Sequence, residues 1–290
     1  MEHPVIDHTI SEEWFEDVGR RLQAESGNLR SRSPFPYVVL DDFLPSDLAI
    51  RSALAFPTPT SESWIHYSHY NSSKWGLTDI SLIPQPIDGV IELLNSERFR
   101  SLLSDATGIP DLLADDELSG GGLHMSGTGG YLNVHTDFSA HPSRRSWRRR
   151  LNLLLYLNND WDESWGGHLE LWDTGVKQCA ERVAPILNRC VIFVTDRNSL
   201  HGVPDPLATP DGRYRCSVAM YYFTDEGREV SRQATKYRAR PDEKGSRLLV
   251  KLDSAVLGGY SRIRDKFGID DRVVGNALAK LKRLGRKSTK

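Results

Sequence analysis

The residues best suited to chemistry are His135, Asp137 and His201. His135 and Asp137 are two positions apart, and in an extended strand such residues lie on the same face. They can therefore bind one metal ion together, whereas His201 would have to come from a strand that is distant in sequence but adjacent in space. Two imidazoles and one carboxylate occupy one face of a metal ion and leave the opposite positions open for other ligands.

A His-x-Asp tripeptide alone is weak evidence, because a chain with nine histidines contains such a spacing by chance. The flanking segments strengthen it. A glycine turn and an apolar run, 129–134, precede His135, and a second apolar run, 190–194, comes before His201. Both runs are typical of strands. Two histidines and one carboxylate on strands are the donor set of non-haem Fe(II) oxygenases, which bind a cosubstrate and dioxygen at the open positions.

The N-terminal part that must support these strands, residues 1–118, shows mostly helical patterns. Helical spacing extends over 12–24, 87–94 and 96–106, and a leading strand follows the first of these helices. Segment 57–75 is turn-rich and aromatic. We predict that the N-terminal part packs on the core, and that segment 57–75 forms either ordinary loop packing or a lid over the site.

The pattern changes to short strands separated by Gly, Asn and Asp over residues 119–225. The run 151–157 is almost entirely apolar, which suits a strand covered on both faces. Such strands at even spacing favour a sandwich or barrel. Residues 226–290 return to helical patterns and end in a basic amphipathic helix, 272–284, which we expect to pack on the domain. The predicted fold is mainly β with flanking helices.

Composition limits the number of domains, the type of partner and the cellular compartment. A chain of 290 residues can bury one large core or at most two, and its net charge of −2 gives no general attraction to nucleic acid or anionic membranes. The three cysteines form no paired motif, which favours a reducing compartment. The N-terminus lacks the apolar core of a signal peptide, and no run approaches eighteen apolar residues. We therefore expect a cytoplasmic protein without a membrane segment.

The order of these motifs resembles that of the Fe(II)/2-oxoglutarate-dependent dioxygenases, in particular the prolyl-4-hydroxylase-like branch. The resemblance covers about a third of the chain and rests on the segments GGYLNVHTDFSAH, RRRLNLLLYLNNDWDESWGGHLELWD, SLHGVPDP and RYRCSVAMYYF. It implies a double-stranded β-helix, which is a jelly-roll or cupin-like barrel, with iron at one mouth. The N-terminal helices would pack on this barrel, and a helical extension would follow it.

The resemblance also implies roles for single residues. The two histidines and the aspartate would bind Fe(II). Arg215 would bind the distal carboxylate of 2-oxoglutarate, with Arg213 as the alternative on the same strand, and Tyr156 would donate a hydrogen bond to that carboxylate. His124 or Met125 falls near a further position that contacts 2-oxoglutarate in several members, and His124 is the residue that we assign to it. Halogenating relatives have a small residue where this chain has Asp137, so the resemblance implies hydroxylation.

Physical chemistry explains why these residue types suit such a reaction. A dianionic keto acid can chelate the metal at its open positions, and its buried distal carboxylate must be paired, because a buried lone charge is costly. Arginine supplies a permanently charged, bidentate fork for that carboxylate. Fe(II), 2-oxoglutarate and O2 would then yield succinate, CO2 and an oxidant able to remove hydrogen from a C–H bond, with ascorbate as a supporting reductant.

Two other functions fit the same motifs: a non-catalytic jelly-roll binding module, and a cupin-like enzyme that uses another divalent metal. The full ligand set and Arg215 count against both. The expected substrate is a small polar metabolite or a peptide or protein side chain. The arginines at 144, 145, 148, 149 and 150 indicate either a solvated rim or a site that selects an anionic substrate. Neither nucleic acid nor a membrane is expected as a partner, and the sequence specifies no oligomeric state.

Overall fold

The computed structural model describes residues 11–59, 63–243, 248–250 and 252–253. The α-helices up to residue 243 are α1 (Glu12–Ala24), α2 (Ser26–Ser31), α3 (Ser46–Leu54), α4 (Ile87–Asn95) and α5 (Glu97–Thr107). The strands are β1 (Tyr37–Leu40), β2 (Ile65–His69), β3 (Ser72–Leu77), β4 (Leu113–Ala114), β5 (Gly122–Ser126), β6 (Tyr131–Thr136), β7 (Trp147–Tyr156), β8 (Leu169–Trp172), β9 (Cys179–Val183), β10 (Cys190–Val194), β11 (Leu200–Val203), β12 (Arg215–Asp225) and β13 (Lys236–Tyr237).

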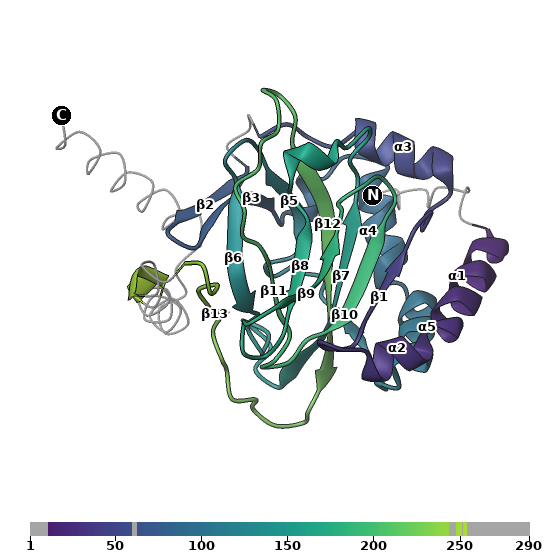
Figure 1. Ribbon diagram of the computed structural model, residues 1–290. Helices are drawn as coiled ribbons and strands as arrows, with labels where there is room; N and C mark the ends of the chain where they lie inside the picture. The colour runs from purple at the N-terminus through teal and green to yellow at the C-terminus, as the bar shows by residue number, and fades with distance from the viewer. Residues whose placement is uncertain (1–10, 60–62, 244–247, 251, 254–290) are drawn as a thin grey trace, which may run out of the picture.

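All described strands belong to one antiparallel sheet. Its main path runs β1-β10-β7-β12-β5-β3-β6-β11-β8-β9, while β2, β4 and β13 pair with β3, β12 and β6. The helices gather on one side of this sheet, next to β7 and β10, and β6 and β13 lie on the opposite side (Figure 1). This mainly antiparallel half-barrel with flanking helices is the predicted double-stranded β-helix architecture.

The helices form because each has an apolar side that neighbouring helices or the sheet cover. In α1 the buried residues Trp14, Val18 and Leu22 recur every four positions, which places them on one side of the helix. Helix α5 begins where the Ser96 hydroxyl accepts a hydrogen bond from the Phe99 backbone N–H, 3.2 Å away. These helices and the sheet residues facing them form the largest hydrophobic cluster of the described chain.

Alternation along the central strands separates this helix-covered face from an inner face. Leu153 and Leu155 of β7 belong to the helix-covered cluster, whereas Tyr156 belongs to a separate cluster with Phe193 and Leu171. Side chains directly opposite each other on paired strands share a face. The inner face therefore carries the polar residues of β7 and β12, and the site is built on it.

Segment 57–75, expected to be a loop or lid, departs from that prediction. Residues 65–69 and 72–77 form the hairpin β2–β3, and β3 pairs with both β5 and β6. The sheet thus extends beyond the predicted core of residues 119–225 at both ends, because β1 to β4 precede it and β13 follows it. A role for the hairpin as a lid stays a prediction.

The C-terminal extension was predicted to be helical. Residues 226–243 contain no helix, and within them Lys236 and Tyr237 form β13 beside β6, whereas the described residues 248–250 and 252–253 are helical. The predicted basic helix, 272–284, lies outside the described residues. No helix in the described ranges is long and apolar enough to cross a membrane. The three cysteines are free thiols, two of them buried.

Candidate metal and cosubstrate site

Strands β6 and β11 bring the two predicted histidines together. His135 and His201 are directly opposite in the antiparallel register, and the pairing shifts just after His201. At Gly202 the strands approach so closely that a Cβ atom would lie 2.8 Å from the Leu132 carbonyl oxygen. Glycine is therefore required next to His201 to keep its ring against β6.

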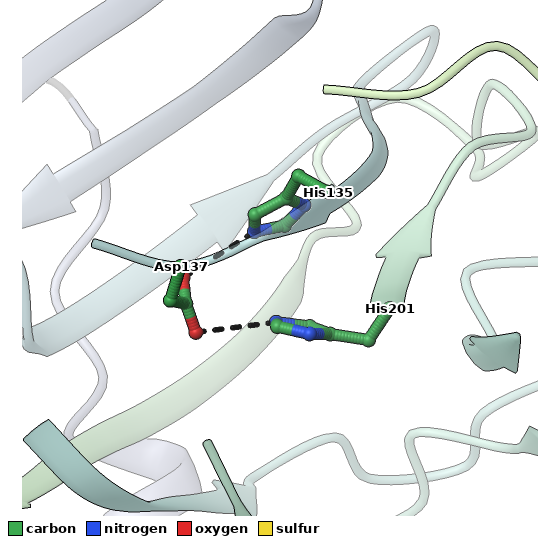
Figure 2. A group of neighbouring side chains, drawn as sticks. All are labelled: His135, Asp137 and His201. Carbon is green, nitrogen blue, oxygen red and sulfur yellow. Dashed lines mark ion pairs between the residues drawn. The ribbon is translucent and has the colours of Figure 1, made fainter. Parts of the chain in front are cut away.

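His135, Asp137 and His201, called the triad below, converge on one point (Figure 2). One ligand atom from each lies within 4.8 Å of the others. Asp137 Oδ1 is 3.5 Å from His135 Nε2, and Asp137 Oδ2 is 3.5 Å from His201 Nε2. The two imidazole rings are 4.5 Å apart, centroid to centroid. These are separations that one divalent ion could bridge, since metal–ligand bonds of about 2 Å place neighbouring donors about 3 Å apart.

The orientation of both imidazoles is fixed by backbone carbonyl groups. His135 Nδ1 lies 2.9 Å from the Asn133 carbonyl oxygen, and His201 Nδ1 lies 2.9 Å from that of Ser199. A carbonyl oxygen only accepts, so each Nδ1 carries the proton and each Nε2 keeps its lone pair facing Asp137. Burial lowers the pKa of His201 to about 4, although Asp137 acts to raise it, so this ring is neutral at neutral pH.

Asp137 is held in its ionised form. Burial would raise its pKa, but the Arg149 guanidinium and the neighbouring histidines hold that pKa well below its usual range. Asn152 donates a hydrogen bond from Nδ2 to Asp137 Oδ2 at 2.7 Å, and its Oδ1 accepts one from Arg149 Nε at 2.8 Å. Asn152 therefore orients both the carboxylate and the cation beside it.

Arg149 corrects the interpretation of the arginine-rich segment as a rim. Only 2% of this residue is exposed, and its Nη2 lies 3.1 Å from Asp137 Oδ2. Strict alternation would put Arg149 and Asn152 on opposite faces, since they are three positions apart. A register shift between Tyr222 and Phe223 of β12 lets both lie inside, because Asn152 is opposite Tyr221 and Arg149 is opposite Phe223.

The other arginines of the segment are paired on the outside, as expected of a solvated rim. Their carboxylate partners are Asp116 and Glu117 for Arg144, Glu229 for Arg145, and Glu226 for Arg148 and Arg150. These ion pairs neutralise the rim, so selection of an anion would have to come from the interior.

Arg215 and Tyr156 meet on the inner face, on neighbouring strands. Arg215 donates from Nε to the Gly167 carbonyl oxygen at 2.7 Å and from Nη2 to the Tyr156 hydroxyl at 3.2 Å. Gly167, with φ of 74°, lies against the arginine: a Cβ there would be 3.1 Å from Arg215 Cδ. Arg213 instead binds the Asn159 carbonyl oxygen and lies beside the Trp165 ring at 5.0 Å.

His124 lies on the same face, opposite Ser217 of β12, which is itself opposite Tyr156. Its Nε2 donates to the Gly120 carbonyl oxygen at 3.0 Å. Burial first, and then the nearby Lys74 ammonium, lower the pKa of His124 well below its usual value. The residue is therefore a neutral group lining the inner face.

Two side chains near the triad were not anticipated from the sequence. The ring of Tyr237, on β13, is 5.4 Å from the ring of His135, centroid to centroid. Lys74, on β3, interacts electrostatically with Asp137. A two-residue strand is too short to show alternation of polar and apolar residues, so the sequence did not indicate that Tyr237 lies near the triad. Lys74 was hidden within the aromatic segment that was interpreted as a loop.

Comparisons with known proteins agree with this arrangement. Residues 121–223 match the family model of the 2OG-Fe(II) oxygenase superfamily. Over 107 residues the chain is 33% identical to Egl nine homolog 1 of Rattus norvegicus, a stretch that covers 37% of this chain and 29% of that protein. The chain thus spans less than a third of the length of this relative.

Two solved structures share the fold. A prolyl hydroxylase of Trichoplax adhaerens, in complex with a hypoxia inducible factor peptide fragment, has a TM-score of 0.52 and 20% identity, covering 76% of this chain and 96% of that one. A prolyl-4-hydroxylase of Pseudomonas putida has a TM-score of 0.50 and 19% identity, covering 70% and 98%.

The family match includes all three triad residues as well as Arg215 and Tyr156. The segment with these residues therefore matches the 2OG-Fe(II) oxygenase superfamily, within a chain that shares the fold of two solved prolyl hydroxylases.

Proposed function

We propose that this protein is an Fe(II)- and 2-oxoglutarate-dependent oxygenase that hydroxylates an unactivated C–H bond. In the balanced reaction, 2-oxoglutarate, O2 and the substrate give succinate, CO2 and the hydroxylated substrate. The observation that carries the proposal is the convergence of two imidazole Nε2 atoms and one carboxylate within 4.8 Å, on the inner face that also presents Arg215.

The donor set fits Fe(II). Both Nε2 lone pairs are available because both Nδ1 protons are used by backbone carbonyls, and Asp137 is ionised. A metal bound by one carboxylate and two neutral imidazoles keeps open positions and a residual positive charge. When bound, Fe(II) would supply the redox chemistry that activates O2.

The chain's own residues would bind and orient the cosubstrate. Arg215 is buried and its fork is held by Gly167 and Tyr156, so the guanidinium is preorganised for a carboxylate. The Tyr156 hydroxyl accepts from Arg215 and can donate its own proton to the same carboxylate. Asn152 would hold Asp137 in the orientation that the metal needs.

The site leaves two substrate types to consider: a small polar metabolite and a peptide or protein side chain. The Trichoplax structure of similar fold holds a peptide fragment, which supports the second type. Peptidyl proline would need an open approach to the triad, whereas a small metabolite could be enclosed by the β2–β3 hairpin. The hairpin pairs with β5 and β6, beside the strand that carries His135.

The proposal is tested by succinate formation and by the visible absorption band that Fe(II) and 2-oxoglutarate give together without oxygen. His135→Ala and Asp137→Ala should abolish both, because each removes a metal ligand. His66→Ala removes an imidazole that stacks on Trp75 outside the triad, and it should retain the band. Retained turnover in the His135 and Asp137 variants would refute the metal assignment.

A second pair of variants tests the cosubstrate assignment. Arg215→Met should weaken 2-oxoglutarate binding by roughly 100-fold, since a charge-assisted bidentate pair contributes about 2–3 kcal/mol. Arg213→Met, two residues before β12 begins and partly exposed, should change the affinity less than about threefold. Unaltered 2-oxoglutarate affinity and activity in Arg215→Met would favour a cupin-like enzyme with another metal.

A further inference from the structure

The inner face next to the triad carries more positive than negative charge, and Lys74 contributes to this excess. Gly76 of β3 is directly opposite His124 of β5, and His124 is opposite Ser217 of β12. Lys74 is two residues before Gly76 on the same strand, so the alternation of a strand places it on that face. Arg215 is two residues before Ser217 and lies there too.

In the described part of the chain, no carboxylate lies close enough to Lys74 to form an ion pair with it. Its Nζ lies 5.6 Å from the centroid of the Tyr67 ring, and in the part of the chain that the structure describes Lys74 forms no ion pair. Burial lowers its pKa to about 8; Asp137 opposes this shift, and Arg215 and Arg149 add to it. Since that pKa lies above 7, the amine is still mostly protonated at neutral pH.

Arg149 is more buried and only partly paired, because its Nε donates to Asn152 and its guanidinium forms an ion pair with Asp137. Its Nη1 is buried without a hydrogen-bond partner, and its Nη2, although 3.1 Å from Asp137 Oδ2, also lacks hydrogen-bond geometry. Its guanidinium carbon lies 3.3 Å from the centroid of the Tyr221 ring. A buried donor left unpaired costs about 1–3 kcal/mol, more when it is charged. A ligand that accepts a hydrogen bond from these donors would remove this cost.

The sum of the charges on the inner face indicates which kind of ligand it would bind. Lys74 is within electrostatic range of one carboxylate, that of Asp137, and of two further cations, Arg215 and Arg149. The charges of Fe(II) and of the 2-oxoglutarate dianion cancel each other, so loading the site does not remove the excess. Two positive charges would remain in a poorly solvated region, where unpaired charge is costly.

We propose that the primary substrate carries a carboxylate, which binds Lys74 and Arg149 beside the triad. This inference rests on the proposed function and narrows its substrate class. Lys74 and Arg149 would then determine specificity by accepting an acid and rejecting its neutral analogue, because an uncharged group would leave the Lys74 ammonium without an ion pair and would not neutralise the charge excess.

The test uses the full chain loaded with Mn(II) and saturating 2-oxoglutarate, at fixed ionic strength. Acetate is the carboxylate probe and acetamide its neutral isostere, and the thermal midpoint Tm is measured against the concentration of each. Acetate should raise Tm saturably in the unaltered protein, and acetamide should not. Lys74→Met should weaken the apparent acetate affinity at least about tenfold, and Lys74→Arg should retain it within about threefold.

Lys177→Met is the matched control, because it removes a lysine that is exposed on the surface. It should behave like the unaltered protein. The inference is wrong if acetate acts like acetamide, or if Lys74→Met responds to acetate as the unaltered protein does. It is also wrong if Lys74→Met loses about tenfold or more in 2-oxoglutarate affinity, since Lys74 would then bind the cosubstrate.

The same measurement separates this inference from the proposed function. If 2-oxoglutarate itself produced no Mn(II)-dependent rise in Tm, the proposed function would be contradicted before any probe was added. Competition between acetate and a blocked glutamyl tripeptide distinguishes the two sources of a carboxylate. A tripeptide that displaces acetate supports an acidic peptide substrate, and one without effect supports a small free acid.

Discussion

The described part of the chain contains two groups of His and acidic side chains close enough to hold a metal ion, and they differ in how their atoms are used. One is the triad, and the other is Asp115, Glu117 and His141. In the second group His141 Nδ1 accepts hydrogen bonds from backbone N–H groups that follow it, so Nε2 carries the proton and donates to Asp115 Oδ1 at 3.0 Å. His141 therefore has no lone pair left for a metal.

The carboxylate of Asp115, in the second group, is also fully used in hydrogen bonds. Asp115 accepts the backbone N–H groups of Glu117 at 3.0 Å and Ser119 at 2.7 Å, besides the bond from His141. In the triad, by contrast, the backbone carbonyls accept the Nδ1 protons and leave both Nε2 atoms facing the carboxylate. Proximity of donor atoms is therefore insufficient for a metal site, because the hydrogen bonds behind the donors decide which group can bind an ion.

Replacing one histidine in each group gives the largest expected contrast between an effect on stability and an effect on metal binding. His141→Ala leaves a buried aspartate without its partner and should lower the free energy of unfolding by about 2–4 kcal/mol. Metal affinity at a temperature where the variant is folded should stay within about threefold of the original. Chemical denaturation and metal titration measure the two effects separately.

His135→Ala should give the reverse result, with metal binding lost and stability of the metal-free protein little changed. A His141→Ala protein that folds normally but fails to bind metal would contradict the comparison, because the second group would then be more than a structural contact.

The triad was predictable from sequence because its signals are local and regular. His135 and Asp137 have the two-residue spacing of a strand, and His201 follows an apolar run in the expected order. Arg215 could be preferred over Arg213 on similar grounds, and the structure places Arg215 inside and Arg213 at the surface. The roles of these residues stay predictions.

What could not be predicted depends on departures from regular alternation. Arg149 lies on the inner face only because the register between β7 and β12 shifts. Such a shift cannot be recognised from the sequence of one strand alone. Strand β2, Ile-His-Tyr-Ser-His, has every residue partly buried, so it shows no alternation to recognise. Hence the hairpin resembled a loop, and Lys74 was overlooked with it.

Asn152 tests whether the hydrogen bonds behind the triad matter as the comparison requires. Asn152→Ala removes the bond to Asp137 Oδ2 and the acceptor of Arg149 Nε. Loss of such an orienting partner should weaken metal binding by roughly 10- to 100-fold. Titration of the metal-free protein measures this effect, and Asn152→Asp, which keeps an acceptor for Arg149 but loses the donor, should not restore affinity. Unchanged affinity in Asn152→Ala would show that Asp137 is oriented by packing alone.

The smallest expected effect concerns the charge excess on the inner face, and it appears in the pH dependence of stability. The pKa of Lys74 is about 8 in the folded protein and near 10.5 in the unfolded chain. Between these values the unfolded chain binds more protons, so this residue makes stability rise with pH. Below pH 8 the buried charge carries its full cost. Lys74→Met should therefore be more stable than the unaltered protein at pH 7, by roughly 1–2 kcal/mol after allowance for partial exposure.

That advantage should shrink steadily from pH 8 to about 10.5, because the remaining lysines are common to both proteins and cancel in the difference. Urea unfolding of the two proteins across this range, without metal or ligand, gives the difference curve. A curve that stays flat, or a variant that is less stable at pH 7, would mean that Lys74 is solvated or paired and that the inner face holds no unbalanced charge for a carboxylate to neutralise.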